Sequence, residues 1–148
     1  MPWPPRQPRG PGADTGPRWV AAVAATVCSF LALDALWLST MSARLYRPAL
    51  GPLLAAAPDW IAAAAFYPLY LAGVVVFAVA PALRGGRRRD AAARGAFLGL
   101  VAYATYDLTN QATLRDWPWA VTLADLAWGM CATAIAAAVG ATAARRRA

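Results

Sequence analysis

Three aspartates lie inside long apolar runs, and their positions along those runs are similar. Asp34 and Asp107 each lie seven residues before the end of such a run, and Asp125 lies six residues after the start of another. Tyr67 lies seven residues after the start of a fourth run. With a rise of about 1.5 Å per residue, each group would lie about 9–10 Å inside the same membrane boundary. We therefore predict one polar layer that four helices share in the outer half of the membrane.

The third run carries most of the candidate pocket residues. Tyr103, Asp107 and Asn110 are spaced so that they share one helical face, and Tyr106 and Thr109 flank that face. A charged Asp at mid-membrane costs about 2.5–3.5 kcal/mol unless it is protonated, hydrogen-bonded or paired. Shared protons or a bound cation would satisfy such a site. The alternative is a purely structural layer, in which buried polar side chains hydrogen-bond the helices to one another.

The composition excludes several kinds of catalytic site. All fourteen basic residues are Arg and all seven acidic residues are Asp, so the chain has no His, Lys or Glu. A Ser/His/Asp triad, a His-ligated metal centre and a Lys Schiff base are therefore impossible. Cys28 and Cys131 are too few for a disulfide framework or a structural zinc site. We predict no cofactor and no metal, and we assign no catalytic residue.

The elements that position these groups are predicted to be four membrane-spanning helices. Runs over about 19–41, 60–83, 95–114 and 119–141 are each near the 20 residues that a hydrocarbon core needs. The fold class is therefore all-α, a four-helix transmembrane bundle over 18–142. Residues 1–17 are predicted to be a disordered tail rich in Pro, Gly and Arg, and 143–148 a basic tail.

Two local features of the predicted spans need comment. Pro68 is expected to kink the second span near Phe66–Tyr70. The outer loop from Ser42 to Asp59 is apolar in its second half, and it fits either a short interfacial helix over 50–57 or a plain loop.

The arginines predict the orientation of the bundle. Eleven lie in the two terminal segments and the loop between the second and third spans, and three lie in the other loops. The positive-inside rule then places both termini in the cytoplasm. Hydrophobic residues make up 60% of the chain, which is typical of a membrane protein. We therefore interpret the net charge of +7 as the arginine signal that orients the chain in the bilayer, and we predict no nucleic-acid binding.

Several short motifs resemble a bacterial membrane-protein family catalogued as domain of unknown function 2177. They are the run Tyr106-Asp107-Leu108-Thr109-Asn110-Gln111-Ala112-Thr113-Leu114 with Trp117, Asp34-x-x-Trp37, Tyr46, Phe66-Tyr67-Pro68-Leu69-Tyr70 and Asp125-x-x-Trp128-Gly129. The resemblance covers about residues 20–140. It implies a small four-span protein of the bacterial inner membrane and transfers no activity.

Three functions fit these observations. The first is an accessory or enzymatic component that acts on membrane lipid, with a lipid or small molecule bound in the Asp/Asn/Tyr pocket. The second is a proton- or cation-coupled transporter, which would need a homo-oligomer because four spans are few. The third is a structural or assembly protein. We favour the first as a hypothesis.

Overall fold

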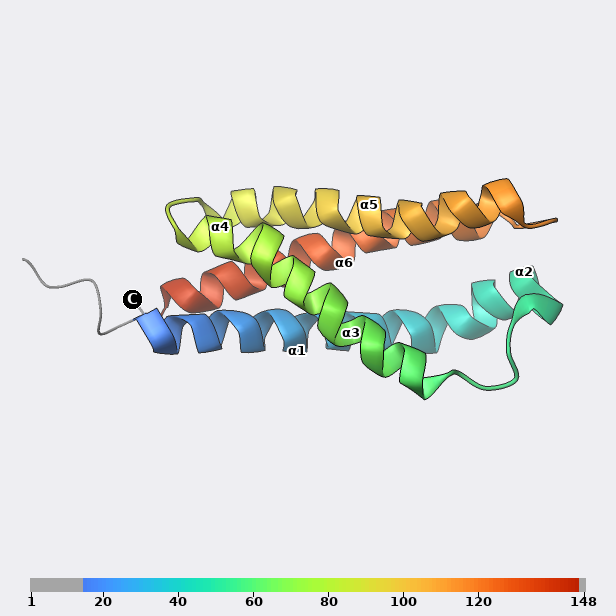
Figure 1. Cartoon of the computed structure of the whole chain (residues 1–148), viewed down its shortest axis with the longest axis horizontal. Coiled ribbons are helices and arrows are strands. Elements are labelled where there is room, and N and C mark those ends of the chain that lie inside the picture. Colours follow the sequence, from blue (N-terminus) through green and yellow to red (C-terminus); the bar gives the residue numbers. More distant parts are fainter. Residues whose placement is uncertain (1–14, 147–148) are drawn as a thin grey trace, which may run out of the picture.

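The computed structural model describes residues 15–146, and all regular structure in this range is helical. The prediction of an all-α fold is confirmed. Four long helical segments run up and down beside one another (Figure 1). Their elements are α1 (Thr15–Met41), η1 (Ser42–Tyr46), α2 (Arg47–Leu50), η2 (Gly51–Leu53), α3 (Trp60–Val74), η3 (Val75–Val79), α4 (Ala80–Leu83), α5 (Arg88–Thr113) and α6 (Trp119–Arg145).

Within residues 15–146, three helical segments are long and apolar enough to cross a membrane: Gly16–Leu53, Trp60–Leu83 and Trp119–Arg145. Helix α5 has a comparable length of 26 residues but does not belong to this group. It carries Arg and Asp in its first turns and polar side chains near its end, which lower its hydropathy. In a membrane, α5 is therefore the helix that depends most on its neighbours.

Helix α6 forms the centre of the bundle because small residues let α5 and α1 approach it closely. A Cβ atom added to Gly99 of α5 would lie 2.0 Å from the carbonyl oxygen of Gly129 in α6. A Cβ atom added to Gly140 would lie 2.0 Å from the Thr26 hydroxyl of α1. Fully buried alanines of α6, including Ala136, fill the core between these contacts.

Both π-helical turns precede a proline by the same distance. The turn η1 ends two residues before Pro48, and η3 ends two residues before Pro81. A proline ring clashes with the carbonyl group four residues earlier, and the wider π turn relieves that clash. Helix α3, in contrast, runs through Pro68 as α-helix, so the change of helical geometry in this span lies at Val75–Val79 and not at Pro68.

The outer loop does not form a helix over 50–57. Gly51 ends α2 with a positive φ of 45°, a single 3-10 turn follows, and residues 51–60 are all exposed. Asp59 then starts α3, because its carboxylate accepts hydrogen bonds from the backbone N–H groups of Ile61 and Ala62 at 2.9 and 3.1 Å. Of the two readings that the sequence leaves open, the structure has the plain loop.

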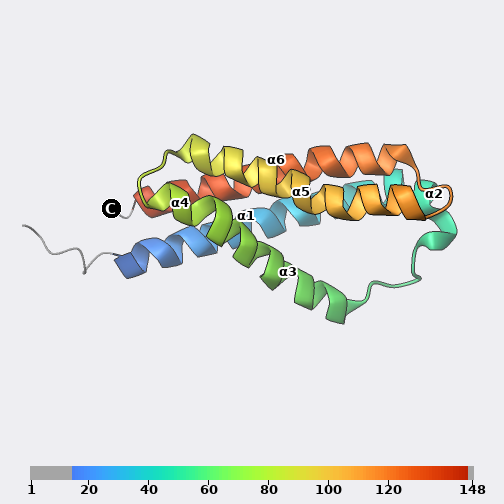
Figure 2. The same ribbon diagram turned by 45° about the horizontal axis from the view of Figure 1, so that its top comes forward.

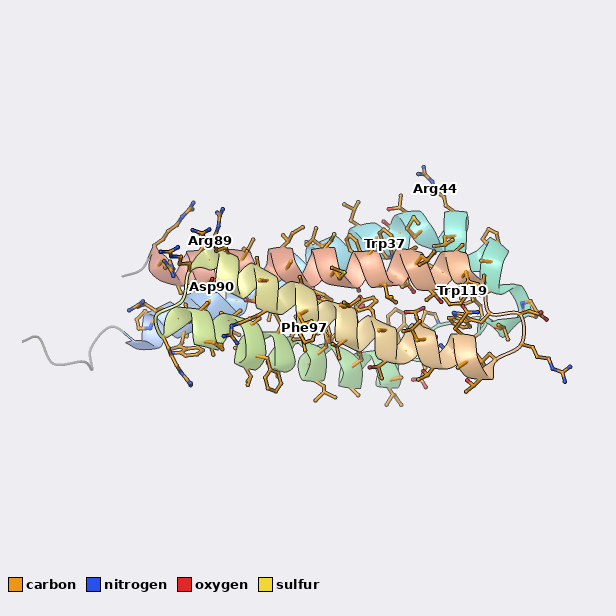
Figure 3. All side chains as sticks on the ribbon, turned by 90° about the horizontal axis from the view of Figure 1, so that it is seen from above. Trp37, Arg44, Arg89, Asp90, Phe97 and Trp119 are labelled. Carbon is orange, nitrogen blue, oxygen red and sulfur yellow. The ribbon has the colours of Figure 1, made fainter. Side chains whose placement is uncertain are left out.

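The two ends of the bundle differ in charge. One end, which we call the Arg-rich end, contains the start of α1, the connection between α4 and α5, and the end of α6 (Figures 1 and 2). The other end, which we call the loop end, contains residues 51–59 and the α5–α6 turn. Arg89 and Arg44 mark the two ends (Figure 3). Of the described arginines, eight belong to the Arg-rich end and three to the loop end.

The bounds of the terminal helices differ from the expected ones. Helix α1 begins at Thr15, within the predicted tail, and residues 1–14 of that tail lie outside the described residues. Helix α6 continues to Arg145, into the stretch expected to be a basic tail.

Candidate functional site

A cavity of about 750 Å³ lies in the loop-end half of the bundle, between α1, α3, α5 and α6. Apolar and aromatic side chains form most of its wall, and Leu54–Pro58 of the outer loop border its mouth. Asp34, Asp107 and Asp125 belong to its lining, and each of these residues is at most 8% exposed. The cavity is therefore an apolar chamber with buried acidic groups.

The three carboxyl groups do not lie at one depth. Trp37 and Trp128 stack with ring centroids 4.4 Å apart and an interplanar angle of 7°, which fixes the register of α1 against α6. Each tryptophan is three residues from an aspartate, and the two helices run in opposite directions. Asp34 therefore lies about 9 Å nearer the Arg-rich end than Asp125.

The prediction of a single shared layer was wrong because the first span does not end at Met41. The helix continues through η1, α2 and η2 to Leu53, so Met41 is an interior residue of a segment of 38 residues. Counting inward from Met41 placed Asp34 too close to the loop end. Consistent with this separation, no three His, Cys, Asp or Glu side chains in residues 15–146 group closely enough to hold a metal ion.

The level nearer the Arg-rich end is built around Asp34. The hydroxyl of Tyr67, from α3, donates a hydrogen bond of 2.5 Å to the Asp34 carboxylate. One turn further along α3, the hydroxyl of Tyr70 shares a 2.6 Å hydrogen bond with Thr133 of α6. These two bonds hold the middle of α3 against α1 and α6.

The level nearer the loop end is built around Asp125, which accepts a hydrogen bond from the hydroxyl of Tyr46. The indole N–H of Trp37 donates to the same tyrosine oxygen at 2.7 Å. Residues nine apart on a regular α-helix lie on opposite faces, because each residue turns the chain by about 100°. The extra residue of the π turn η1 changes that direction, and it brings Tyr46 toward the face of Trp37.

Asp107 shares the level of Asp125 but has no such donor. A Cβ atom on Gly129 would lie 2.3 Å from the Tyr103 ring, so this ring packs against Gly129, from a backbone position one turn nearer the loop end than Gly99. Asp107 and Asp125 are each four residues from that contact, in the same direction along the bundle. Asp107 is 0% exposed, and neither carboxylate oxygen has a hydrogen-bond partner among the described residues. It is a buried acid that nothing in the described chain neutralises.

The predicted pocket residues divide into two groups. Asp34, Tyr103, Tyr106, Asp107 and Asp125 border the cavity. Tyr67 is not part of the lining, but it donates a hydrogen bond to Asp34. Thr109 and Asn110 are not part of its lining. Thr109 is exposed, and its hydroxyl donates to the carbonyl groups of Thr105 and Tyr106, one turn earlier in the same helix.

Sequence reasoning missed four residues of the site. Tyr46 lies in the segment predicted as outer loop, and Trp37 and Trp128 were part of the family resemblance only, so none of the three was predicted for the pocket. Trp117 was likewise part of the family resemblance only, but it is buried and borders the cavity. Its indole N–H donates to Thr122 at 3.1 Å. The recurring Asp-x-x-Trp spacing was the signal that could have identified the tryptophan pair.

Comparisons with known proteins give one match. The family described as "Predicted membrane protein (DUF2177)" matches residues 19–142. No curated protein matches this chain, and no solved structure matches it. The matched range includes every aspartate of the cavity and most of the described structure. The chain belongs to the DUF2177 family of predicted membrane proteins, whose function is unknown.

Proposed function

We propose that this membrane protein binds a membrane lipid in the cavity of its loop-end half, as an accessory or enzymatic component that acts on lipid. The observation that carries the proposal is the buried carboxyl group of Asp107, which has no hydrogen-bond partner within residues 15–146 and belongs to a chamber with mostly apolar walls. Such a group needs a polar partner, whereas the surrounding walls suit hydrocarbon.

The size of the cavity supports a ligand of this class. Its volume of about 750 Å³ falls within the range of about 300–1,000 Å³ that is typical of small-molecule sites. Trp37, Leu38, Leu50 and Val121 contribute apolar surface, and the acids provide polar groups at separate points of the wall. An amphipathic molecule matches this distribution better than a fully polar one.

Exposed cavity residues on α3 and α5 support entry from the membrane. Phe66 of α3 and Tyr106 of α5 both border the cavity, and they are 46% and 59% exposed. Helix α5 packs against η3 and α4, in the other half of the bundle. The loop-end part of α3 diverges from the other helices (Figure 2). A lipid chain could therefore reach the cavity laterally.

The same observations favour binding over transport. In the Arg-rich half, α5, α6 and α1 meet through glycine contacts, and the core there consists of fully buried side chains such as Phe30 and Ala136. The cavity does not extend along this packed half. A transporter would need a route through it.

The arginine distribution supports an orientation in which both chain ends face the cytoplasm of a bacterial cell and the loop end faces outward across the inner membrane. The cavity would then open toward the outer leaflet. A reporter that is active only in the cytoplasm tests this when fused to the C-terminus. An active fusion is expected, and activity only from a periplasmic reporter would reverse the orientation.

Blocking the cavity tests the proposed binding. Ala102 borders the cavity on α5, whereas Ala112 of the same helix is exposed and does not border it. We expect Ala102→Phe protein, purified in mild detergent, to retain several-fold less lipid than Ala112→Phe protein when extracted lipid is quantified by mass spectrometry. Melting temperatures of both variants show whether each is folded. Equal lipid content in two folded variants would contradict the proposal.

A further inference from the structure

We propose that the ligand carries a primary ammonium group, and that Asp107 binds this group with Asp125 beside it. This inference rests on the proposed function and names the chemistry of the lipid head. The three buried acids differ in the hydrogen bonds that they accept. Asp34 and Asp125 each accept a tyrosine hydroxyl, and Asp107 accepts none within residues 15–146.

A cation is the partner that the charge of the lining favours. Three carboxyl groups border the cavity, against one basic residue, Arg47, which is exposed in α2. Burial of several acids without compensating charge is costly, so a positive group in the cavity stabilises the whole set. A ligand with an anionic head alone would add to the repulsion.

An ammonium group fits the geometry better than a metal ion does. Calcium binds six to eight oxygen ligands at about 2.3–2.6 Å, which requires acids that converge on one point. The described part of the chain has no such cluster of three. An ammonium group has three N–H donors, so one or two carboxyl groups together with neutral acceptors are enough.

Aromatic rings provide further contacts for a cation in the same chamber. The stacked Trp37 and Trp128 and the ring of Tyr103 border the cavity. Cations are attracted to the faces of such rings, and most strongly to tryptophan. The indole N–H of Trp128 is buried and has no acceptor among the described residues. It could donate to an oxygen near the amine, such as a phosphate or ester oxygen of an aminolipid.

Amphiphiles that differ only in the head group test this inference. The probes are a long-chain alkylammonium, the alcohol and the sulfonate of equal chain length, and ethanolamine as a soluble amine without a chain. Binding to the purified full chain is followed by tryptophan fluorescence. We expect the alkylammonium to bind at least about tenfold more tightly than the alcohol, which corresponds to about 1.4 kcal/mol. Ethanolamine is expected to compete weakly, because it lacks the apolar part.

The matched variants are Asp107→Asn and Asp116→Asn. Each removes one carboxylate, but Asp116 is exposed in the α5–α6 turn, where its φ of 55° suits Asn equally well. We expect Asp107→Asn to reduce the preference for the amine to about twofold or less and to leave alcohol binding unchanged. We expect Asp116→Asn to behave as the wild type.

The possible failures of the two proposals can be told apart. If the amine and the alcohol bind equally well, or the sulfonate binds best, the ammonium inference is wrong and the cavity still binds lipid. If Asp107→Asn keeps the full preference for the amine, Asp107 is not the residue that binds the cation. If no amphiphile binds and ethanolamine alone does, the proposed lipid site itself is wrong.

Discussion

The contact between α5 and α6 at Gly99 allows the sharpest prediction about stability. In Gly99→Ala the new Cβ atom would lie 2.0 Å from the carbonyl oxygen of Gly129, about 1.4 Å short of an ordinary contact of 3.4 Å. The obstacle is backbone, which no rotamer change can move, so the two helices must separate. Overpacking of this kind costs about 1–3 kcal/mol, and a backbone clash places the cost in the upper part of that range.

We expect the melting temperature of Gly99→Ala in detergent to fall by about 4–10 °C, measured by circular dichroism. The matched control is Gly73→Ala in α3, because a Cβ atom there meets nothing within 4 Å. Alanine favours helix over glycine by about 1 kcal/mol, so the control should melt at the wild-type temperature or above it. If Gly99→Ala melts with the control, α5 and α6 do not approach as closely as the structure indicates.

The tyrosine partners of the two satisfied acids allow further predictions. Tyr46→Phe should lower the free energy of unfolding by about 1–3 kcal/mol, because it leaves the buried Asp125 without its donor. Tyr67→Phe should have an effect of similar size through Asp34. Tyr106→Phe is the control, since the Tyr106 ring is 59% exposed and its hydroxyl makes no hydrogen bond with a described residue. Thermal unfolding in one detergent compares all three, and equal losses in Tyr46→Phe and Tyr106→Phe would contradict the reasoning.

The helices could be predicted from the sequence because apolar runs of sufficient length allow little else in a membrane. The run from Trp60 to Leu83 is predicted and observed with the same bounds. The spacing of Tyr103, Asp107 and Asn110 predicted one shared helical face, and Tyr103 and Asp107 of that face border the cavity. These properties depend on local pattern, which is what a single sequence records.

The depth of Asp34 in the bundle and the direction of the Tyr46 side chain could not be predicted in the same way. The position of Asp34 depends on where its helix ends, and Met41 resembles an end only because arginines and prolines follow it. The structure continues the helix by inserting the π turn η1 before Pro48. The same turn directs Tyr46 to Asp125, which is 79 positions away in the chain. A one-residue change of helical register leaves no trace in hydropathy, so neither result could be anticipated.

The buried acids were predicted to serve either as structural hydrogen-bonding groups or as part of a binding pocket, and these two interpretations apply to different acids. A structural layer requires that each buried polar group hydrogen-bonds another helix, and Asp34 and Asp125 meet this requirement through Tyr67 and Tyr46. Those two bonds connect α3 to α1 and η1 to α6, and they account for both residues without any ligand. Asp107 makes no such bond within the described chain, although it is the most buried of the three. Burial of the Asp107 carboxyl group costs free energy that no hydrogen bond within the described chain offsets. A partner from outside the chain would explain why an acid occupies that position.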